Sequence, residues 1–332
     1  MDRDTTAALY APAARAAAAA FPVEAGEIEL VAVSENVTFR VTDANDDRRY
    51  VLRLHRPGYN SLAALRSERQ WVQALNDAGI AAPRGVAARD GRLFVPVVIE
   101  AAGETRQAGM THWTAGEVLA EALEGSDPAL VERRMGQLGA IAAAIHNQAS
   151  AWAIPPGFDR RILDAEGLIG GAPLWGRFWE HPGLSPGERT LILATRERIA
   201  GALARYARTP ENFGLIHADL HTGNVLVDGD RLTVIDFDDA AFGWRQYEIA
   251  VALTPYSEAP NFAAVEAAFL AGYRGARSLP DRDAGVIAMF MLIRQLAVIG
   301  WLHQRPEIAV AERFAAMKAA VCAGCERFEA PC

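Results

Sequence analysis

The chain has 332 residues, 51% of them hydrophobic, and a formal net charge of −8 at pH 7. The length suits two lobes or domains, and the composition is that of a soluble globular protein. The acidic balance argues against an extended surface for nucleic acid or for an anionic membrane, and we expect neither partner.

The sequence contains no clear membrane or secretion signal. Its uninterrupted apolar runs stay well short of the roughly 18 residues that a transmembrane helix requires. Residues 1–20 are rich in Ala and include acidic residues, which predicts a helix rather than a signal peptide. The three cysteines are Cys322, Cys325 and Cys332, and reduced thiols are the default in the cytosol. We therefore expect a cytoplasmic protein.

The first third of the chain predicts strands mixed with helices. The predicted elements are a helix over 4–20, strands over 27–33, 37–42 and 49–55, a helix over 61–78, and strands near 84–88 and 92–99. The polar stretch 100–109, which contains glycine, predicts a connection between two lobes.

The remainder of the chain predicts mainly helices. The segments with helix-compatible patterns are 114–124, 128–148, 186–208, 244–253, 262–273, 282–303 and 309–328. A sheet-rich region followed by a helical region is the α+β arrangement. We predict an N-terminal nucleotide-binding lobe over residues 1–101 and a C-terminal lobe for catalysis and acceptor binding over residues 102–332.

Two short motifs interrupt the helical part. Residues 217–224 read HADLHTGN, and residues 235–238 read IDFD. Apolar runs flank both motifs, and Asp228-Gly229 predicts a hairpin turn between them. The order matches the kinase pattern H-x-D-x-x-x-x-N followed by D-F-x.

The spacing of these motifs assigns chemical roles. In the kinase pattern the first Asp accepts the proton of the attacking hydroxyl, and the Asn and the second Asp hold Mg²⁺ against the nucleotide phosphates. We therefore predict Asp219 as the base, and Asn224 and Asp236 as metal ligands. Two further carboxylates, Asp238 and Asp239, lie within three positions of Asp236, and so many acids repel one another without cations.

At these residues the sequence resembles the superfamily of aminoglycoside phosphotransferases, choline kinases and homoserine kinase-like proteins. These proteins write the first loop as H-x-D-x-x-x-x-N and continue with I-D-F-x-x-A, which residues 235–240 match. The resemblance implies a two-lobed protein-kinase-like fold, with a small antiparallel-sheet lobe and a larger helical lobe. It also implies ATP and Mg²⁺ as cofactors, but it does not identify the acceptor.

The nucleotide-binding half lacks a glycine-rich phosphate loop, since neither G-x-x-x-x-G-K-[ST] nor G-x-G-x-x-G occurs. Small polar residues of the strand–turn–strand segment 31–42, namely Ser34, Asn36 and Thr38, are the candidates to approach the phosphates. The alternative is an ordinary polar hairpin.

The third strand offers Arg53 where the resembling proteins usually carry Lys, and the chain has a single lysine, Lys318. Arg keeps the position cationic and can bind phosphate in a bidentate manner. Glu68 lies within the apolar stripe of the helix 61–78, so it needs a partner, and Arg53 is the predicted one. The alternative for Glu68 is the edge of the stripe, beside other arginines or solvent.

Other residues have more than one interpretation. We expect His217 to be structural, His221 to help orient phosphate or acceptor, and Glu248 to tie the backbone of the catalytic loop. The aromatic, Pro- and Gly-rich segment 152–187 either lines an acceptor pocket or packs into the core.

The leading prediction is an ATP- and Mg²⁺-dependent phosphotransferase that acts on a hydroxyl of a small molecule. The alternatives are a protein Ser/Thr kinase of the same fold, a nucleotide-binding pseudokinase suggested by Arg53, and a zinc hydrolase that uses His217, Asp219 and His221. The stretch between Asp236 and Trp244 is too short for an activation loop, which favours small acceptors.

Overall fold

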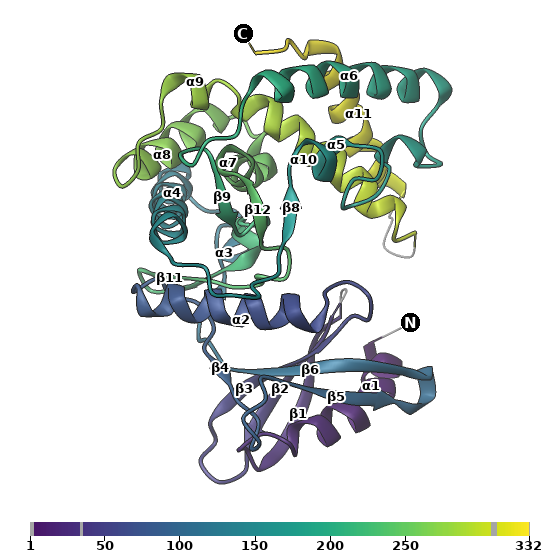
Figure 1. Cartoon of the computed structure of the whole chain (residues 1–332), viewed down its shortest axis with the longest axis vertical. Helices are drawn as coiled ribbons and strands as arrows, with labels where there is room; N and C mark the ends of the chain where they lie inside the picture. The colour runs from purple at the N-terminus through teal and green to yellow at the C-terminus, as the bar shows by residue number, and fades with distance from the viewer. Residues whose placement is uncertain (1–2, 34–35, 307–310, 332) are drawn as a thin grey trace. The chain divides into compact units, whose positions relative to one another are not determined.

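The computed structural model describes residues 3–33, 36–306 and 311–331 (Figure 1). The chain forms two compact units. The first unit comprises residues 1–119, 153–160 and 225–238, and the second comprises residues 120–152, 161–224 and 239–332. Each unit is made of several separate stretches of the chain, so these units do not test the lobe boundary predicted between residues 101 and 102. That boundary stays a prediction.

One antiparallel sheet forms the centre of the first unit. Its strands follow the order β1-β2-β3-β6-β4, and β5 also pairs with β6. The strands are β1 (Ala25–Val33), β2 (Val37–Asp43), β3 (Arg49–His55), β4 (Gly85–Val86), β5 (Phe94–Ile99) and β6 (Glu104–His112). Along β2 every second side chain is buried, which is the period of a strand with one face on a core.

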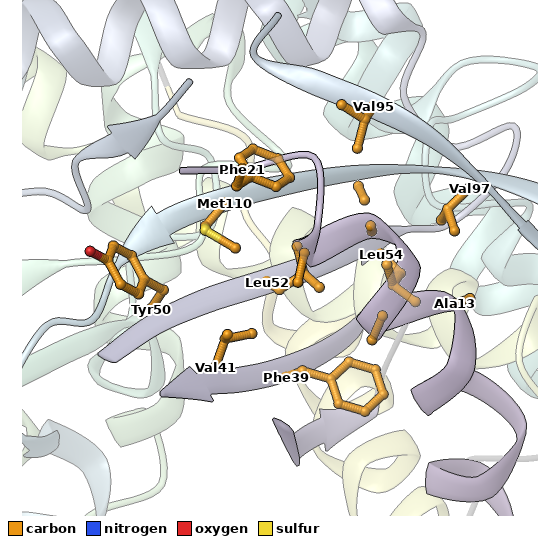
Figure 2. Packing of buried hydrophobic residues seen from close by; sticks show 14 of the residues in the cluster. Ala13, Phe21, Phe39, Val41, Tyr50, Leu52, Leu54, Val95, Val97 and Met110 are labelled. Carbon is orange, nitrogen blue, oxygen red and sulfur yellow. The ribbon is translucent and has the colours of Figure 1, made fainter. Parts of the chain in front are cut away.

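The core of the first unit lies between this sheet and helix α1 (Arg3–Ala18), which packs against β1 and β5. Figure 2 shows Phe39, Leu52, Leu54 and Met110 of the sheet gathered with Phe21, which follows α1. Burying side chains of this size stabilises the fold by about 1.5–3 kcal/mol each relative to full exposure. The N-terminal helix predicted from the Ala-rich sequence is therefore part of the core.

Helix α2 (Leu62–Asp77) begins at Ser61, whose side chain accepts a hydrogen bond from the Ala64 backbone N–H. It ends before Gly79, which adopts a left-handed φ of 83°. One face of the helix is apolar and buried, as the sequence pattern predicts, and Glu68 lies on that face.

The polar stretch 100–109 was expected to connect two lobes, and this expectation was wrong. After the short η1 (Glu100–Ala102), the stretch continues as β6, which pairs with β3, β4 and β5. Arg106 of β6 is buried, donates to Glu104 at 2.6 Å and to the Tyr10 hydroxyl at 3.1 Å. A polar sequence can form an inner strand when its charged groups find such partners.

A second, three-stranded sheet of the first unit has the order β11-β10-β7. Strands β10 (Val225–Asp228) and β11 (Arg231–Val234) form the predicted hairpin around Gly229. The segment 114–124 was predicted to be a helix, but it forms β7 (Glu117–Val118) and only one helical turn, α3 (Leu119–Ala122). Gly116, with φ 127°, lies so close to the Val227 carbonyl that a Cβ atom would be 2.8 Å from its oxygen. This left-handed glycine and the pairing with β10 exclude a longer helix.

The second unit is mainly helical, and its helices lie around a small sheet with the strand order β8-β12-β9 (Figure 1). The strands are β8 (Arg161–Leu163), β9 (Phe213–Ile216) and β12 (Ala241–Trp244). The helices are α4 (Pro128–Ala151), α5 (Ala165–Ile169), α6 (Pro186–Arg205), α7 (Arg245–Leu253), α8 (Phe262–Arg274), α9 (Asp281–Ala284), α10 (Ile287–His303) and α11 (Ala311–Arg327), with short 3₁₀ turns η2 (Phe178–Glu180), η3 (Thr222–Asn224) and η4 (Thr254–Tyr256). Residues 309 and 310 of the last predicted helix lie outside the described residues.

Within the described residues, one stretch, Asp281–His303, is long and apolar enough to span a membrane by length and composition. Of its most apolar 18-residue window, 61% is buried within the protein, as is common for a core helix of a soluble protein. Helix α10, which supplies most of this stretch, packs against α7 and α11.

The cysteines of α11 are free thiols: Cys322 is half-buried and Cys325 is buried. Burial raises the pKa of Cys325 to about 11, so this thiol is not a reactive thiolate near neutral pH.

Candidate active site

The candidate base Asp219 lies in the second unit, on the loop between β9 and η3. The Asn224 side-chain nitrogen Nδ2 donates to Asp219 Oδ2 at 2.8 Å and to the Asp219 carbonyl oxygen at 2.9 Å. Because Asp219 uses the amide nitrogen of Asn224, the amide oxygen is the atom that can ligate a metal. The structure thus brings these two predicted residues together.

A residue that the sequence analysis did not single out also contacts the candidate base. Arg294 of α10 donates from Nη2 to Asp219 Oδ1 at 2.5 Å. Burial alone would raise the pKa of Asp219, but the charges of Arg294 and His221 hold it below its usual value. The signal in the sequence is a single arginine inside a mostly apolar helix, since a buried charge needs a partner.

The backbone of this loop is strained and firmly held. Ala218 adopts a left-handed φ of 68°, which is uncommon for a residue with a side chain. The buried Glu248 of α7 accepts from the His217 backbone N–H at 3.0 Å and from the Ala218 backbone N–H at 2.6 Å. The expectation that Glu248 ties the catalytic loop is therefore confirmed.

Glu248 is supported in turn by two buried side chains. His146 Nε2 of α4 lies 3.4 Å from Glu248 Oε1, and His146 Nδ1 lies 2.8 Å from the Tyr273 hydroxyl of α8. Burial raises the pKa of Glu248, but the contacts to His146 and His217 outweigh it and the pKa is lowered. Glu248 therefore holds the loop as a carboxylate.

We expect Glu248→Gln to destabilise the fold by about 1–3 kcal/mol and to lower turnover, because the amide places a donor where a buried backbone N–H needs an acceptor. Urea unfolding measures the first effect and steady-state kinetics the second. The control is Glu258→Gln at an exposed site, for which we expect a change within about 0.5 kcal/mol. Equal unfolding free energies for the two variants would contradict the role of Glu248.

The second predicted metal ligand, Asp236, lies in the first unit beside Arg53 of β3. Arg53 Nη1 donates to Asp236 Oδ1 at 2.9 Å and lies 3.4 Å from Asp238 Oδ1. Burial alone would lower the pKa of Arg53, but the carboxylates of Asp236 and Asp238 raise it above its usual value. The predicted phosphate-binding cation and metal ligand are thus neighbours.

The loop that carries Asp236 is anchored on both sides of the backbone. Asp236 adopts a left-handed φ of 64°, and the next residue, Phe237, packs edge-on against Trp71 of α2 with ring centroids 5.6 Å apart. Arg160 donates to the Asp238 carbonyl oxygen at 2.6 Å, and Asn60 donates to the same oxygen at 3.1 Å. These contacts fix the direction of the Asp236 side chain.

Asp238 takes the place of the glycine in D-F-G, and its carboxylate is buried. Asn36 Nδ2 donates to it, and His55 Nδ1 lies 3.8 Å from Oδ1. Burial would raise the pKa of Asp238, but Arg53, His55 and the bond from Asn36 lower it to about 2.

Asn36 is occupied by this contact and by the Arg56 backbone N–H, which donates to its Oδ1 at 3.0 Å. Its predicted approach to nucleotide phosphates stays a prediction. Ser34, predicted for the same role, lies outside the described residues.

Glu68 does not form the direct ion pair with Arg53 that the sequence predicts. No hydrogen bond or ion pair joins these two described residues, and Glu68 Oε2 is buried without a hydrogen-bond partner. Burial and the charge of Asp238 raise the pKa of Glu68 to about 7. Arg53 pairs with Asp236 and Asp238 instead of Glu68, because these two aspartates, distant in sequence, lie closer to its guanidinium.

In the aromatic segment 152–187 the packing interpretation holds for two side chains, and an acceptor pocket stays a prediction. Trp175 and Phe178 are buried, and Trp175 stacks on Tyr247 of α7 with ring centroids 6.0 Å apart. Trp175 also lies beneath the Arg294 guanidinium, 5.8 Å from its Cζ.

A strained His-x-Asp loop with a bonded Asn, followed by an anchored Asp-Phe-Asp loop beside a cation, defines a phosphotransferase of the protein-kinase-like class. The model of the phosphotransferase enzyme family matches residues 27–285, and the chain belongs to this family. The zinc hydrolase alternative is therefore wrong. In the described part of the chain no three His, Cys, Asp or Glu side chains cluster as a metal site.

Relatives of known name agree with this class. The chain is 23% identical over 298 residues to amicoumacin kinase of Bacillus subtilis (strain 168), covering 87% of this chain and 83% of that protein. It is 27% identical over 216 residues to homoserine kinase of Neisseria meningitidis serogroup B (strain ATCC BAA-335 / MC58), covering 62% and 60% respectively.

Solved structures confirm the kinase-like α+β fold. A microcompartment-associated aminopropanol kinase has a TM-score of 0.81 and 30% identity, and the match covers 95% of this chain and 94% of that chain. An amicoumacin kinase in complex with AMP-PNP, Ca²⁺ and Ami has a TM-score of 0.78 and 20% identity, with 98% and 96% covered.

Proposed function

We propose that the protein transfers the γ-phosphate of ATP to a hydroxyl of a small molecule, with Mg²⁺ as the metal. The observation that carries this proposal is the Asp219 carboxylate, which Asn224 orients on a loop held by Glu248. Asp219 takes the proton of the acceptor hydroxyl. The hydroxyl oxygen forms a bond to the γ-phosphorus, the bond to the bridging oxygen breaks, and ADP leaves.

The chemistry of the side chains fits Mg²⁺, which prefers oxygen ligands, retains waters and needs only one or two carboxylates besides the phosphates. We propose Asp236 and the amide oxygen of Asn224 as its protein ligands. When bound at these two side chains, Mg²⁺ would supply positive charge that stabilises the phosphate group during transfer. The ion pair between Asp236 and the Arg53 guanidinium supports a ligand role for Asp236, since its carboxylate already lies beside a positive charge.

For the nucleotide we propose that Arg53 contacts the phosphates and that the nearby Glu68 helps to orient Arg53 through its charge. Asn36 and Ser34 are proposed to lie near the phosphates. The neighbouring structure that contains AMP-PNP and Ca²⁺ supports a nucleoside triphosphate and a divalent cation.

The acceptor that we propose is a small molecule and not a protein. Strand β12 begins at Ala241, directly after the Asp-Phe-Asp loop, so the chain has no room for an activation segment. The relatives named after aminopropanol, amicoumacin and homoserine support a small acceptor. We also propose a cytoplasmic location, in which the free thiols of Cys322 and Cys325 would stay reduced.

The test is ADP release coupled to mass detection of a phosphorylated product, with Mg·ATP and a panel of amino alcohols, hydroxy acids, sugars and aminoglycosides. We expect a product with at least one alcohol, and none when the metal is chelated. Nucleotide binding without transfer to any alcohol would favour the pseudokinase alternative.

Arg53 is the main departure from the resembling proteins. We expect Arg53→Ala to weaken ATP binding by about 10- to 100-fold, because it removes a charged phosphate contact. Arg53→Lys distinguishes a general cation position, which retains activity, from a site shaped for guanidinium, which loses it. Calorimetric titration with ATP measures the affinity of both variants and steady-state kinetics measures their activity, with the exposed Arg92→Ala as control. An unchanged affinity in Arg53→Ala would remove Arg53 from the nucleotide site.

A further inference from the structure

The buried carboxylate of Asp238 has no part in the proposed phosphate transfer, although it lies two positions after the proposed metal ligand Asp236. The side chain of Asp238 is 10% exposed, whereas that of Asp236 is 39% exposed. The backbone of Asp238 is also held, because its carbonyl oxygen accepts hydrogen bonds from Arg160 at 2.6 Å and from Asn60 at 3.1 Å. A carboxylate buried to this degree needs partners, and these partners indicate its role.

The two carboxylate oxygens of Asp238 face two residues that we propose for the nucleotide site. Oδ2 accepts a hydrogen bond from Asn36, and Oδ1 lies 3.4 Å from Arg53 Nη1. Asn36 directly precedes β2 and Arg53 lies within β3, so one side chain links the Asp-Phe-Asp loop to both strands. Oδ1 is buried and accepts no hydrogen bond among the described residues, and its nearest ion-pair partner is Arg53.

This position requires a carboxylate, because both neighbours present N–H groups to it. A carboxylate offers an acceptor at each oxygen, whereas the amide of asparagine offers one acceptor and one donor group. With Asn at position 238, either Asn36 or Arg53 would face a second N–H donor. With Gly, the guanidinium of Arg53 would lose a buried counter-charge.

The other two carboxylates near Arg53 are less suited to orient it while nucleotide is bound. Asp236 lies closer, at 2.9 Å, but it is the proposed metal ligand, and a bound metal would compete for its oxygen atoms. Glu68 forms no hydrogen bond or ion pair with Arg53 among the described residues. Of the three carboxylates, Asp238 alone is both paired with Arg53 and outside the proposed metal ligands.

We propose that Asp238 is the main positioning residue for the phosphate-binding cation, and that it holds Arg53 and Asn36 in place for the nucleotide. The inference rests on the proposed function and adds a residue to its nucleotide site. In protein kinases a helix glutamate pairs with the lysine of the third strand. Here two departures from that pattern, Arg for Lys at position 53 and Asp for the glycine of D-F-G at position 238, form one unit.

Titration of the full chain with ATP, with Mg²⁺ and with a chelator, tests this inference, because a contact between Arg53 and phosphate needs no metal. We expect Asp238→Asn to weaken ATP binding by about 10-fold under both conditions, as is typical for loss of a residue that supports a ligand-binding group. In an Arg53→Met background the same substitution should change the affinity by less than about twofold, since Asp238 acts through Arg53. Glu68→Gln should cost less affinity than Asp238→Asn.

Steady-state kinetics and a matched control separate this role from structural damage. Asp238→Asn should raise the KM for ATP more than it lowers kcat. Asp90→Asn removes an exposed carboxylate of the same unit that also pairs with an arginine, and it should leave the ATP affinity unchanged. Unfolding temperature shows whether each variant is folded. If Asp238→Asn does not fold, Asp238→Gly takes its place in the same comparison.

The outcomes of this test are distinct. An unchanged ATP affinity in a folded Asp238 variant, or an equal loss with and without Arg53, overturns the inference and leaves the proposed function standing. A loss that appears only with Mg²⁺ also overturns it, because Asp238 would then act at the metal.

A loss in Glu68→Gln as large as that in Arg53→Met overturns the inference as well, since Glu68 would then orient the cation. Failure of the wild type to bind ATP, or to transfer phosphate to any alcohol of the panel, overturns the proposed function and the inference with it.

Discussion

Replacing Asp219 by Asn is expected to lower kcat by about 10²- to 10⁴-fold, since the amide cannot take the proton of the acceptor hydroxyl. The substitution keeps the size of the side chain, so the loop held by Glu248 should remain in place. The affinity for nucleotide should change little, because no phosphate contact is assigned to this residue.

Two measurements check this prediction. Steady-state kinetics with the best acceptor gives kcat, and calorimetric titration with a non-hydrolysable ATP analogue gives the nucleotide affinity. The exposed Asp228→Asn, at the end of β10, is the matched control and should behave like the wild type. Wild-type turnover in Asp219→Asn would show that another group accepts the proton.

The Asp236→Asn substitution is expected to weaken the binding of ATP in the presence of Mg²⁺ by at least about 100-fold, while the affinity for metal-free ATP should change little. Loss of residues that merely support metal ligands already reduces metal affinity by about 10- to 100-fold, and Asp236 is proposed to be a ligand itself. Asn is preferred to Ala for this test, because Asp236 adopts a left-handed φ of 64° that Asn tolerates.

The measurement is a titration of ATP in the presence of Mg²⁺ and in the presence of a chelator. In the wild type the two affinities should differ strongly, and in Asp236→Asn they should converge. The exposed Asp46→Asn serves as control, since Asp46 pairs only with neighbouring Arg48 among the described residues. The same metal dependence in Asp236→Asn and in the control would exclude Asp236 as a ligand.

The local elements of the chain were largely predictable, because their signals lie within a few residues. The hairpin of β10 and β11 follows from two short apolar runs on either side of Asp228-Gly229, and α2 follows from Ser61, an apolar stripe and Gly79. The motif around Asp219 indicated the loop and its class of chemistry for the same reason, since kinases require these residue types at this spacing.

Other features depend on contacts that local patterns do not contain. The stretch 100–109 is polar, yet it forms an inner strand because β3 and β5 pair with it on either side. Gly116 keeps the predicted helix 114–124 from forming over its full length, because Gly116 packs against the backbone of β10, which lies more than a hundred positions later. Pairing with distant strands can override local propensity, which differs by only about 1 kcal/mol between residue types.

The sequence by itself determined the class of enzyme and predicted Asp219 as the base, because the motif around Asp219 is local and chemically specific. Only the tertiary structure decided which partners the charged groups take. Arg53 lies beside Asp236 and Asp238 and not Glu68, Asp238 binds Asn36, and Arg294 binds Asp219. These partners are 75 to 202 positions apart along the chain. A buried charge requires some partner, but packing chooses which one lies within reach.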